Sequence, residues 1–123
     1  MTDSRNRIER LSNAAYETAM RNQNSCIGPD HLLYVVCSTE EGRRDIESRG
    51  GDYKRILNYL KHSFMSRSEP ESVTAPDFNP PFQEIMAEPV MRLREGSIKD
   101  VTVAAVLLSL IGNHRVCPIT TSA

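Results

Sequence analysis

One histidine and two cysteines lie close together in the sequence and are the first candidates for chemistry. Cys26, His31 and Cys37 are separated by five and six positions, and these spacings match no standard pattern of zinc ligands. His31 and Cys37 fall on one predicted helix, where residues six apart face different sides, which argues against a nucleophile–base pair. We therefore predict no metal site, no cofactor and no catalytic residue, and we keep a small enzyme using His31 and a cysteine as an alternative.

The sequence also lacks a loop that could hold nucleotide phosphates. No Gly-x-x-x-x-Gly-Lys-Ser/Thr motif occurs in it, so it has no recognisable means of binding ATP. The net charge is −1 and the isoelectric point is about 6.3, which gives no overall attraction to nucleic acid or anionic lipid. This charge argues against a second alternative, a helical DNA-binding protein.

Length and composition predict one globular domain over residues 1–123. The chain is 39% hydrophobic and 25% charged, which suits a domain with one modest core. Its longest purely apolar run, residues 103–108, is far shorter than the roughly 20 residues needed to cross a bilayer. The charged residues 1–11 contain no apolar signal core, and three cysteines fit a reducing compartment. We expect a cytoplasmic protein that does not enter membranes.

Helical spacing of apolar residues along most of the chain predicts an all-α fold. The predicted helical segments are residues 7–22, 28–38, 39–50, 52–64, 82–96 and 97–113, the last with Thr102 as its N-cap. Residues 66–81 contain four of the seven prolines, which predicts a linker or long surface loop. Pro89 should delay the fifth helix to about Glu88, since a proline inside a helix costs roughly 3 kcal/mol or forces a kink.

The second helical segment pairs a polar start with a very apolar remainder. Pro29 suits the first turn of a helix, where its missing N–H would have no partner, and Asp30 favours the positive end of the helix dipole. The apolar residues that follow leave almost no polar side, and they are Leu32, Leu33, Val35 and Val36. We therefore predict a central helix that is buried nearly all round.

The same arrangement occurs a second time 74 residues later. Residues 8–37 align with residues 82–111, and this alignment places Leu32 on Val106 and Leu33 on Leu107. Each half contains an amphipathic helix, a short polar break and a very apolar helix, and neither half is able to cover its apolar helix alone. We predict an internal duplication, with repeat 1 at about residues 5–64 and repeat 2 at about residues 82–114, packed around one core.

These residues resemble a known family. The segment IGPDHLLYVV at residues 27–36, its weaker copy VTVAAVLL at residues 101–108, and FNP at residues 78–80 are similar to motifs of the N-terminal Clp repeat domain. That domain opens the Clp AAA+ unfoldases of the ClpA, ClpB, ClpC and ClpV types. The resemblance covers about residues 5–113.

The sequence departs from the family pattern at several positions. Gly28 replaces the usual hydroxyl cap of the first copy, which weakens the cap by a few tenths of a kcal/mol. Pro89 replaces an alanine-like residue. The eighth helix of the family domain has no counterpart after residue 114, so we expect the last helix to be missing.

The resemblance implies two pseudo-repeated four-helix motifs and a non-catalytic protein-recognition module. Such a module binds substrate proteins or adaptor proteins and presents them to attached AAA+ motor domains in a larger parent chain. The alternative within the family is a stand-alone Clp-repeat accessory protein without a motor, which modulates a Clp protease or chaperone complex. The length of the native polypeptide would separate the two.

The resemblance also assigns the candidate partner-binding residues. Family members bind peptides or adaptors in a shallow apolar groove, for which Phe78, Tyr16 and Phe82 are the candidates here. Asp30 stands where some members use an acid to receive a guanidinium group, but the second copy carries Ala104, so a symmetric pair of such sites is absent. The simpler role of Asp30 is to complement the helix dipole. For His31 the resemblance implies a structural role at the start of its helix.

Overall fold

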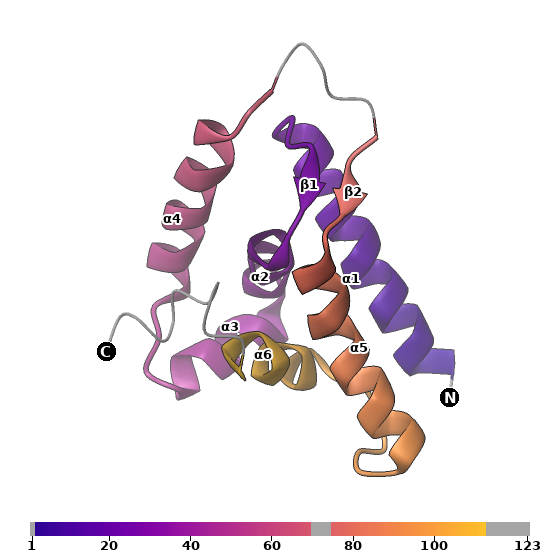
Figure 1. Ribbon diagram of the computed structural model, residues 1–123. Coiled ribbons are helices and arrows are strands. Elements are labelled where there is room, and N and C mark those ends of the chain that lie inside the picture. The colour runs from indigo at the N-terminus through magenta and orange to yellow at the C-terminus, as the bar shows by residue number, and fades with distance from the viewer. Residues whose placement is uncertain (1, 70–74, 113–123) are drawn as a thin grey trace.

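The computed structural model describes residues 2–69 and 75–112, and it confirms an all-α fold. The described elements, in chain order, are α1 (Thr2–Arg21), β1 (Cys26–Ile27), α2 (Pro29–Ser38), α3 (Glu40–Ser48), α4 (Tyr53–Ser66), β2 (Asp77–Phe78), α5 (Pro80–Glu95) and α6 (Val103–Gly112). Figure 1 shows α1 and α5 on one side of α2 and α4 on the other. None of the described helices combines the length and apolar content that a membrane span requires.

α2 is the centre of the fold. It packs against α1, α3, α4, α5 and α6, and Leu32, Leu33 and Val36 have no exposed surface. Val35 is 7% exposed, so the prediction that this helix is buried nearly all round is confirmed. A helix that is apolar on every side is stable in water only when neighbouring elements cover it completely.

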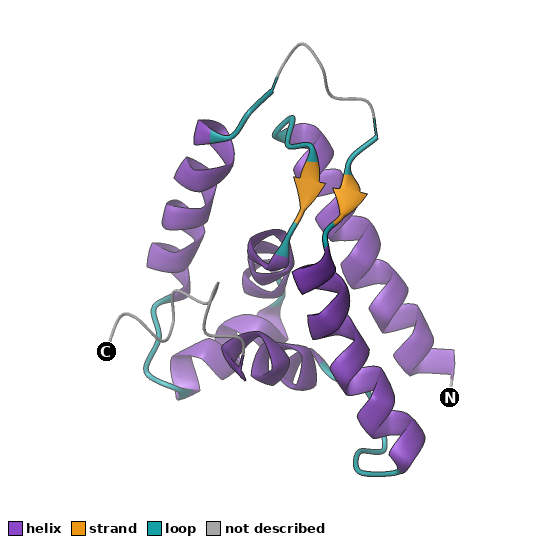
Figure 2. Cartoon of the chain, viewed as in Figure 1, coloured by secondary structure: helices purple, strands orange, loops and turns teal. Residues whose placement is uncertain are grey.

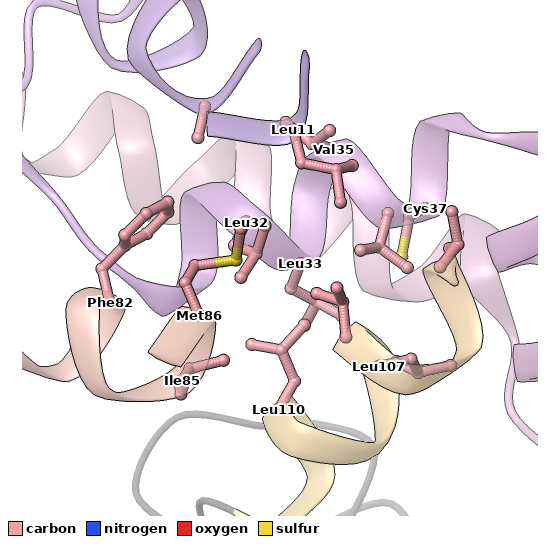
Figure 3. Close-up of a cluster of buried hydrophobic side chains, with 14 of the residues drawn as sticks. Leu11, Leu32, Leu33, Val35, Cys37, Phe82, Ile85, Met86, Leu107 and Leu110 are labelled. Atoms are coloured by element: carbon pink, nitrogen blue, oxygen red, sulfur yellow. The ribbon is translucent and has the colours of Figure 1, made fainter. Parts of the chain in front are cut away.

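α6 is the second very apolar helix, and it completes the core from below α2. Val106, Leu107 and Leu110 are buried, and Figure 3 shows Leu110 near Leu33 and Ile85. The predicted cap of α6 is confirmed, because the Thr102 hydroxyl oxygen accepts a hydrogen bond from the amide of Ala105 over 3.1 Å.

Pro89 lies inside α5, and the predicted late start of this helix is wrong. α5 runs without interruption from Pro80 to Glu95. A proline has no N–H, so the carbonyl of Ile85, four residues earlier, cannot receive the usual helical bond. The hydroxyl of Ser109 on α6 donates to this carbonyl oxygen over 2.8 Å. The partner helix therefore replaces the bond that Pro89 removes.

The segment predicted as a linker, residues 66–81, contains one strand, β2, which pairs in parallel with β1. Cys26 pairs with Asp77 and Ile27 with Phe78, and Figure 2 shows the two arrows side by side. Each strand leads through one capping residue into a helix that begins with proline, Pro29 in α2 and Pro80 in α5. The pair sets the starting points of these two helices next to each other.

The bounds of the helices follow the predicted duplication in part. An offset of 74 carries Pro29–Ser38 onto the bounds of α6. α1 and α5 differ in length, with 20 and 16 residues. A rotation that relates the two halves, and with it the pseudo-repeat itself, stays a prediction.

Candidate functional site

An apolar groove lies between α1 and α5. Its volume is about 560 Å³, and its apolar lining consists of Ile8 from α1, Phe78 from β2, and Phe82, Met86, Ala87, Val90 and Met91 from α5. Polar side chains contribute at three points, Ser12, Gln83 and Arg94.

The groove exists because α1 and α5 both pack against α2 but scarcely against each other. Ile8 and Ser12 are four residues apart on α1, so they project from one face toward the groove. Phe82, Met86 and Val90 follow the same spacing on α5. One row of side chains from α1 and one from α5 therefore line the open groove.

Three of the four residues predicted to bind partners form one aromatic cluster at the end of this groove. The ring centres of Phe78 and Phe82 are 4.9 Å apart, and those of Tyr16 and Phe78 are 6.4 Å apart. Phe82 is 3% exposed and forms part of the floor, whereas Phe78 and Tyr16 are half-buried. The amide group of Gln83 donates to the backbone oxygen of Phe78 over 2.9 Å, which fixes the position of Phe78 relative to α5.

Other lining residues were not predicted from the sequence. Met91 is 58% exposed, so it offers a flexible apolar side chain that can adapt to different ligands. Ile8, Met86 and Val90 complete the lining. Met86 and Val90 follow Phe82 at four-residue spacing on α5, which is a signal in the sequence, but a helix that began near Glu88 would not have placed Phe82 and Met86 on it.

The fourth predicted residue, Asp30, does not line the groove. Its carboxylate accepts a hydrogen bond from the backbone amide of His31 over 3.0 Å and a second one from the guanidinium of Arg67. Burial by itself would raise the pKa of Asp30, but the contact with His31 and the charge and hydrogen bond of Arg67 outweigh it and lower that pKa below its ordinary value. Asp30 therefore stabilises the start of α2 and ties it to the end of α4.

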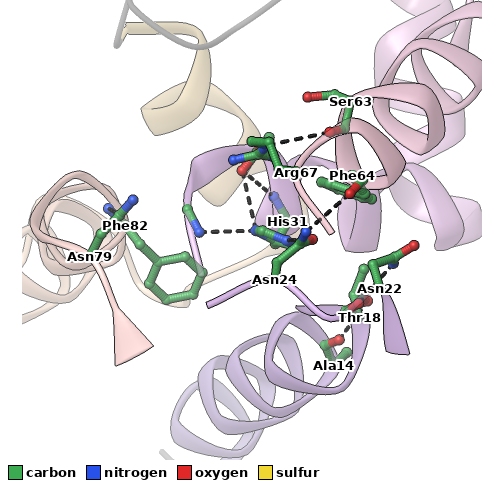
Figure 4. Close-up of polar contacts among 12 residues, drawn as sticks. Ala14, Thr18, Asn22, Asn24, His31, Ser63, Phe64, Arg67, Asn79 and Phe82 are labelled. Atoms are coloured by element: carbon green, nitrogen blue, oxygen red, sulfur yellow. Dashed lines mark hydrogen bonds and ion pairs between the residues drawn. The ribbon is translucent and has the colours of Figure 1, made fainter. Parts of the chain in front are cut away.

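His31 is fully buried, and both of its ring nitrogens are engaged. The amide of Gly28 donates to Nδ1 over 3.0 Å, so the proton of the ring lies on Nε2, which donates to the side-chain oxygen of Asn24 over 2.9 Å. Asn24 in turn donates to the backbone oxygen of Phe64 over 3.0 Å. The rings of His31 and Phe64 stack at 4.4 Å, and Figure 4 shows this set with Arg67 above it.

The network around His31 connects the segment between α1 and α2 with the end of α4, which follows about 40 residues later in the sequence. It joins the turn after α1, the cap of α2 and the end of α4 through side chains inside the protein. Gly28 fits this corner closely, since a Cβ there would lie 2.9 Å from a carboxylate oxygen of Asp30 and 3.1 Å from the amide nitrogen of Asn79. The imidazole thus takes the part that a glutamate or glutamine three residues after the cap has in a capping box. The Asp30 carboxylate accepts from the amide of His31, which is the bond that a hydroxyl residue at position 28 would otherwise make.

The cysteines do not gather around His31. Cys26 is exposed and Cys37 is buried, while Cys117 lies outside the described residues. Within residues 2–69 and 75–112, no three His, Cys, Asp or Glu side chains come close enough together to hold a metal ion.

Comparison with known proteins adds no relative. No model of a protein family matches the chain, and no curated protein matches it significantly.

Proposed function

We propose that this chain is a non-catalytic protein-recognition module that binds an apolar segment of another protein in the groove between α1 and α5. The observation that carries the proposal is the groove itself, a space of about 560 Å³ bordered by half-buried and exposed apolar side chains. Ligand-binding sites on proteins are usually concave and mostly apolar, with a few polar groups at the edge, and the groove has this character.

The lining suits ligands of varied sequence. Met86 and Met91 can change rotamer at little cost, and Phe78 offers one face of its ring at the rim. A bound segment would fill the groove with two or three apolar side chains in the way that grooves between helices accept amphipathic peptides. Arg94 at one end of the groove would favour a carboxylate on the ligand.

We further propose that the module serves a Clp-type AAA+ unfoldase, to which it presents substrate or adaptor proteins. Three features support this: the motif at residues 27–36, the equal bounds of α2 and α6 under the 74-residue offset, and the position of Phe78 next to the groove. On this proposal the chain supplies binding only, and a tether to the motor raises the local concentration of the captured protein.

Two matched substitutions test the groove. Met91→Glu places a charge in the groove, whereas Met20→Glu makes the same change at an exposed methionine of α1 that does not line it. Both variants should fold, because both side chains are exposed. Binding of a permanently unfolded probe, reduced and carboxymethylated α-lactalbumin, is measured by fluorescence anisotropy.

The two variants should differ clearly in their affinity for the probe. We expect Met91→Glu to weaken binding about tenfold or more, since a carboxylate would have to be desolvated beneath the ligand, and Met20→Glu to bind like the unmodified chain. Equal binding by both variants would show that the groove is not the site.

A further inference from the structure

α4 carries positive charge without any acidic residue to balance it. Its sequence contains Lys54, Arg55 and Lys61 and no aspartate or glutamate. The other described helices that carry lysine or arginine also carry acids, and in α3 and α5 these form ion pairs four residues apart, Glu40–Arg44, Asp45–Arg49 and Glu88–Arg92. Positive charge on α4 is therefore concentrated rather than neutralised.

The charged side of α4 faces away from the core. α4 packs on α2 and α3 through Ile56, Leu60 and Phe64. Its exposed positions form what we call the α4 outer face: Lys54, Arg55, Asn58, Tyr59, Lys61, His62, Met65 and Ser66. Tyr59 is 60% and Met65 is 70% exposed. Tyrosine, methionine and arginine are the residue types that protein interfaces favour over ordinary surface.

No described acid neutralises these three cations. Lys54, Arg55 and Lys61 form no ion pair within the described part of the chain. The nearest acid on the chain, Asp52, caps the helix, and its carboxylate accepts from the amides of Lys54 and Arg55 over 3.1 and 3.3 Å. Asp52 also borders a hollow of about 540 Å³ that the three cations line, so positive charge stays in excess there.

We propose that the α4 outer face docks an acidic segment of a partner protein. The charge of the face selects carboxylates, and the exposed side chains of Tyr59 and Met65 add apolar contact area on the same face. Three cations neutralise far fewer phosphates than the roughly 6–10 that firm DNA binding uses, and the net charge of −1 opposes a long polyanion. An acidic protein segment fits the size and charge of the face better than nucleic acid.

This surface is separate from the groove. α4 lies across α2 from α1 and α5 (Figure 1), and no residue of α4 lines the groove. One partner can therefore occupy the groove while another holds the α4 outer face.

The test uses a short helical peptide built from glutamate, leucine and alanine, with a copy that carries glutamine for every glutamate. Binding of each peptide is followed by NMR through the backbone amide signals of the full chain, because this method detects weak complexes. The triple variant Lys54→Glu, Arg55→Glu and Lys61→Glu is compared with Arg10→Glu, Arg21→Glu and Lys99→Glu, which change the net charge equally at exposed positions elsewhere.

We expect the glutamate peptide to shift signals of α4, and the glutamine copy to shift none. The α4 triple variant should bind about tenfold more weakly or worse, because attraction becomes repulsion, while the control variant keeps its affinity. If both triple variants lost affinity for the peptide equally, the effect would come from net charge alone, and this would overturn the proposal. So would signals confined to α5, or a DNA duplex that binds the same face more tightly than the peptide. A Met91→Glu chain that still binds the peptide separates this face from the groove.

Discussion

The hydroxyl of Ser109 donates to the carbonyl oxygen of Ile85 over 2.8 Å, in the buried contact between α6 and α5. This carbonyl is the one that Pro89 leaves without an amide donor. The same hydroxyl lies 3.2 Å from a carboxylate oxygen of Glu88, but the shorter contact to the carbonyl takes its single proton. A proline and a buried serine are both unusual inside a helix. Here the serine of α6 supplies the hydrogen bond that the proline removes from α5, so the two residues compensate for each other.

Replacing Ser109 by alanine should reveal this compensation. We expect Ser109→Ala to lower the free energy of unfolding by about 1–3 kcal/mol, because the Ile85 carbonyl then lacks a partner in the core. In a Pro89→Ala background the amide of residue 89 can bond to that carbonyl, so the same substitution should cost clearly less. A double-mutant cycle by urea denaturation measures the difference, and strictly additive effects would contradict the role of Ser109.

Removal of the buried imidazole of His31 should also lower the free energy of unfolding, because it leaves buried polar groups without partners. His31→Leu leaves the amide of Gly28 and the side chain of Asn24 without their partners, so the free energy of unfolding should fall by roughly 2–4 kcal/mol. His62→Leu is the matched control, since His62 is exposed on α4, and it should stay within about 0.5 kcal/mol. Nitrogen-15 NMR of the unmodified chain should report the Nε2–H tautomer of His31, and the other tautomer would refute this network.

Asp30 should make stability depend on pH in the acid range. Its pKa is lower in the folded chain than in the unfolded chain, so the folded state binds this proton less readily. The stabilisation is therefore present above the ordinary pKa of an aspartate and is lost as the pH falls through the lowered value. Asp30→Asn should cost on the order of 1 kcal/mol near neutral pH, and this cost should vanish in acid.

Arg67 offers a control for that pH dependence. Arg67→Met removes one of the charges that lower the pKa of Asp30, so the acid loss of stability should begin at a higher pH than in the unmodified chain. Thermal melts over a series of acidic buffers measure both variants. A cost of Asp30→Asn that stays constant at every pH would show that the carboxylate charge plays no part.

The two phenylalanines at the groove should separate binding from stability. Phe78→Ala removes a half-buried ring at the rim and should weaken binding of an unfolded probe protein with little effect on melting. Phe82→Ala empties a site that is 3% exposed and should lower the free energy of unfolding by about 3 kcal/mol or more. Calorimetry and anisotropy on the same preparations compare them, and a collapse of melting temperature in Phe78→Ala would assign that ring to the core.

Periodicity in the sequence was sufficient for the helices and for the burial of α2, because 3.6-residue spacing is a local property of the chain. It was insufficient for the strand pair, since strands of two residues such as Cys26–Ile27 have no measurable period. The start of α5 was misjudged because the bond partner of the Ile85 carbonyl, Ser109, lies on another helix. The aromatic end of the groove was predicted from Phe78 and Phe82, while Met91 was missed because its exposure depends on how α5 is placed.

The position of α2 has a consequence for cooperativity. Every other helix in the described chain touches it, so none of them can detach far without exposing the same apolar rod to water. Amide hydrogens at the middle of α2 should then exchange with solvent only when the whole domain opens, with the free energy of global unfolding. If the chain is divided between α4 and α5, each of the two fragments should be unfolded alone, and the two should regain structure when they are mixed.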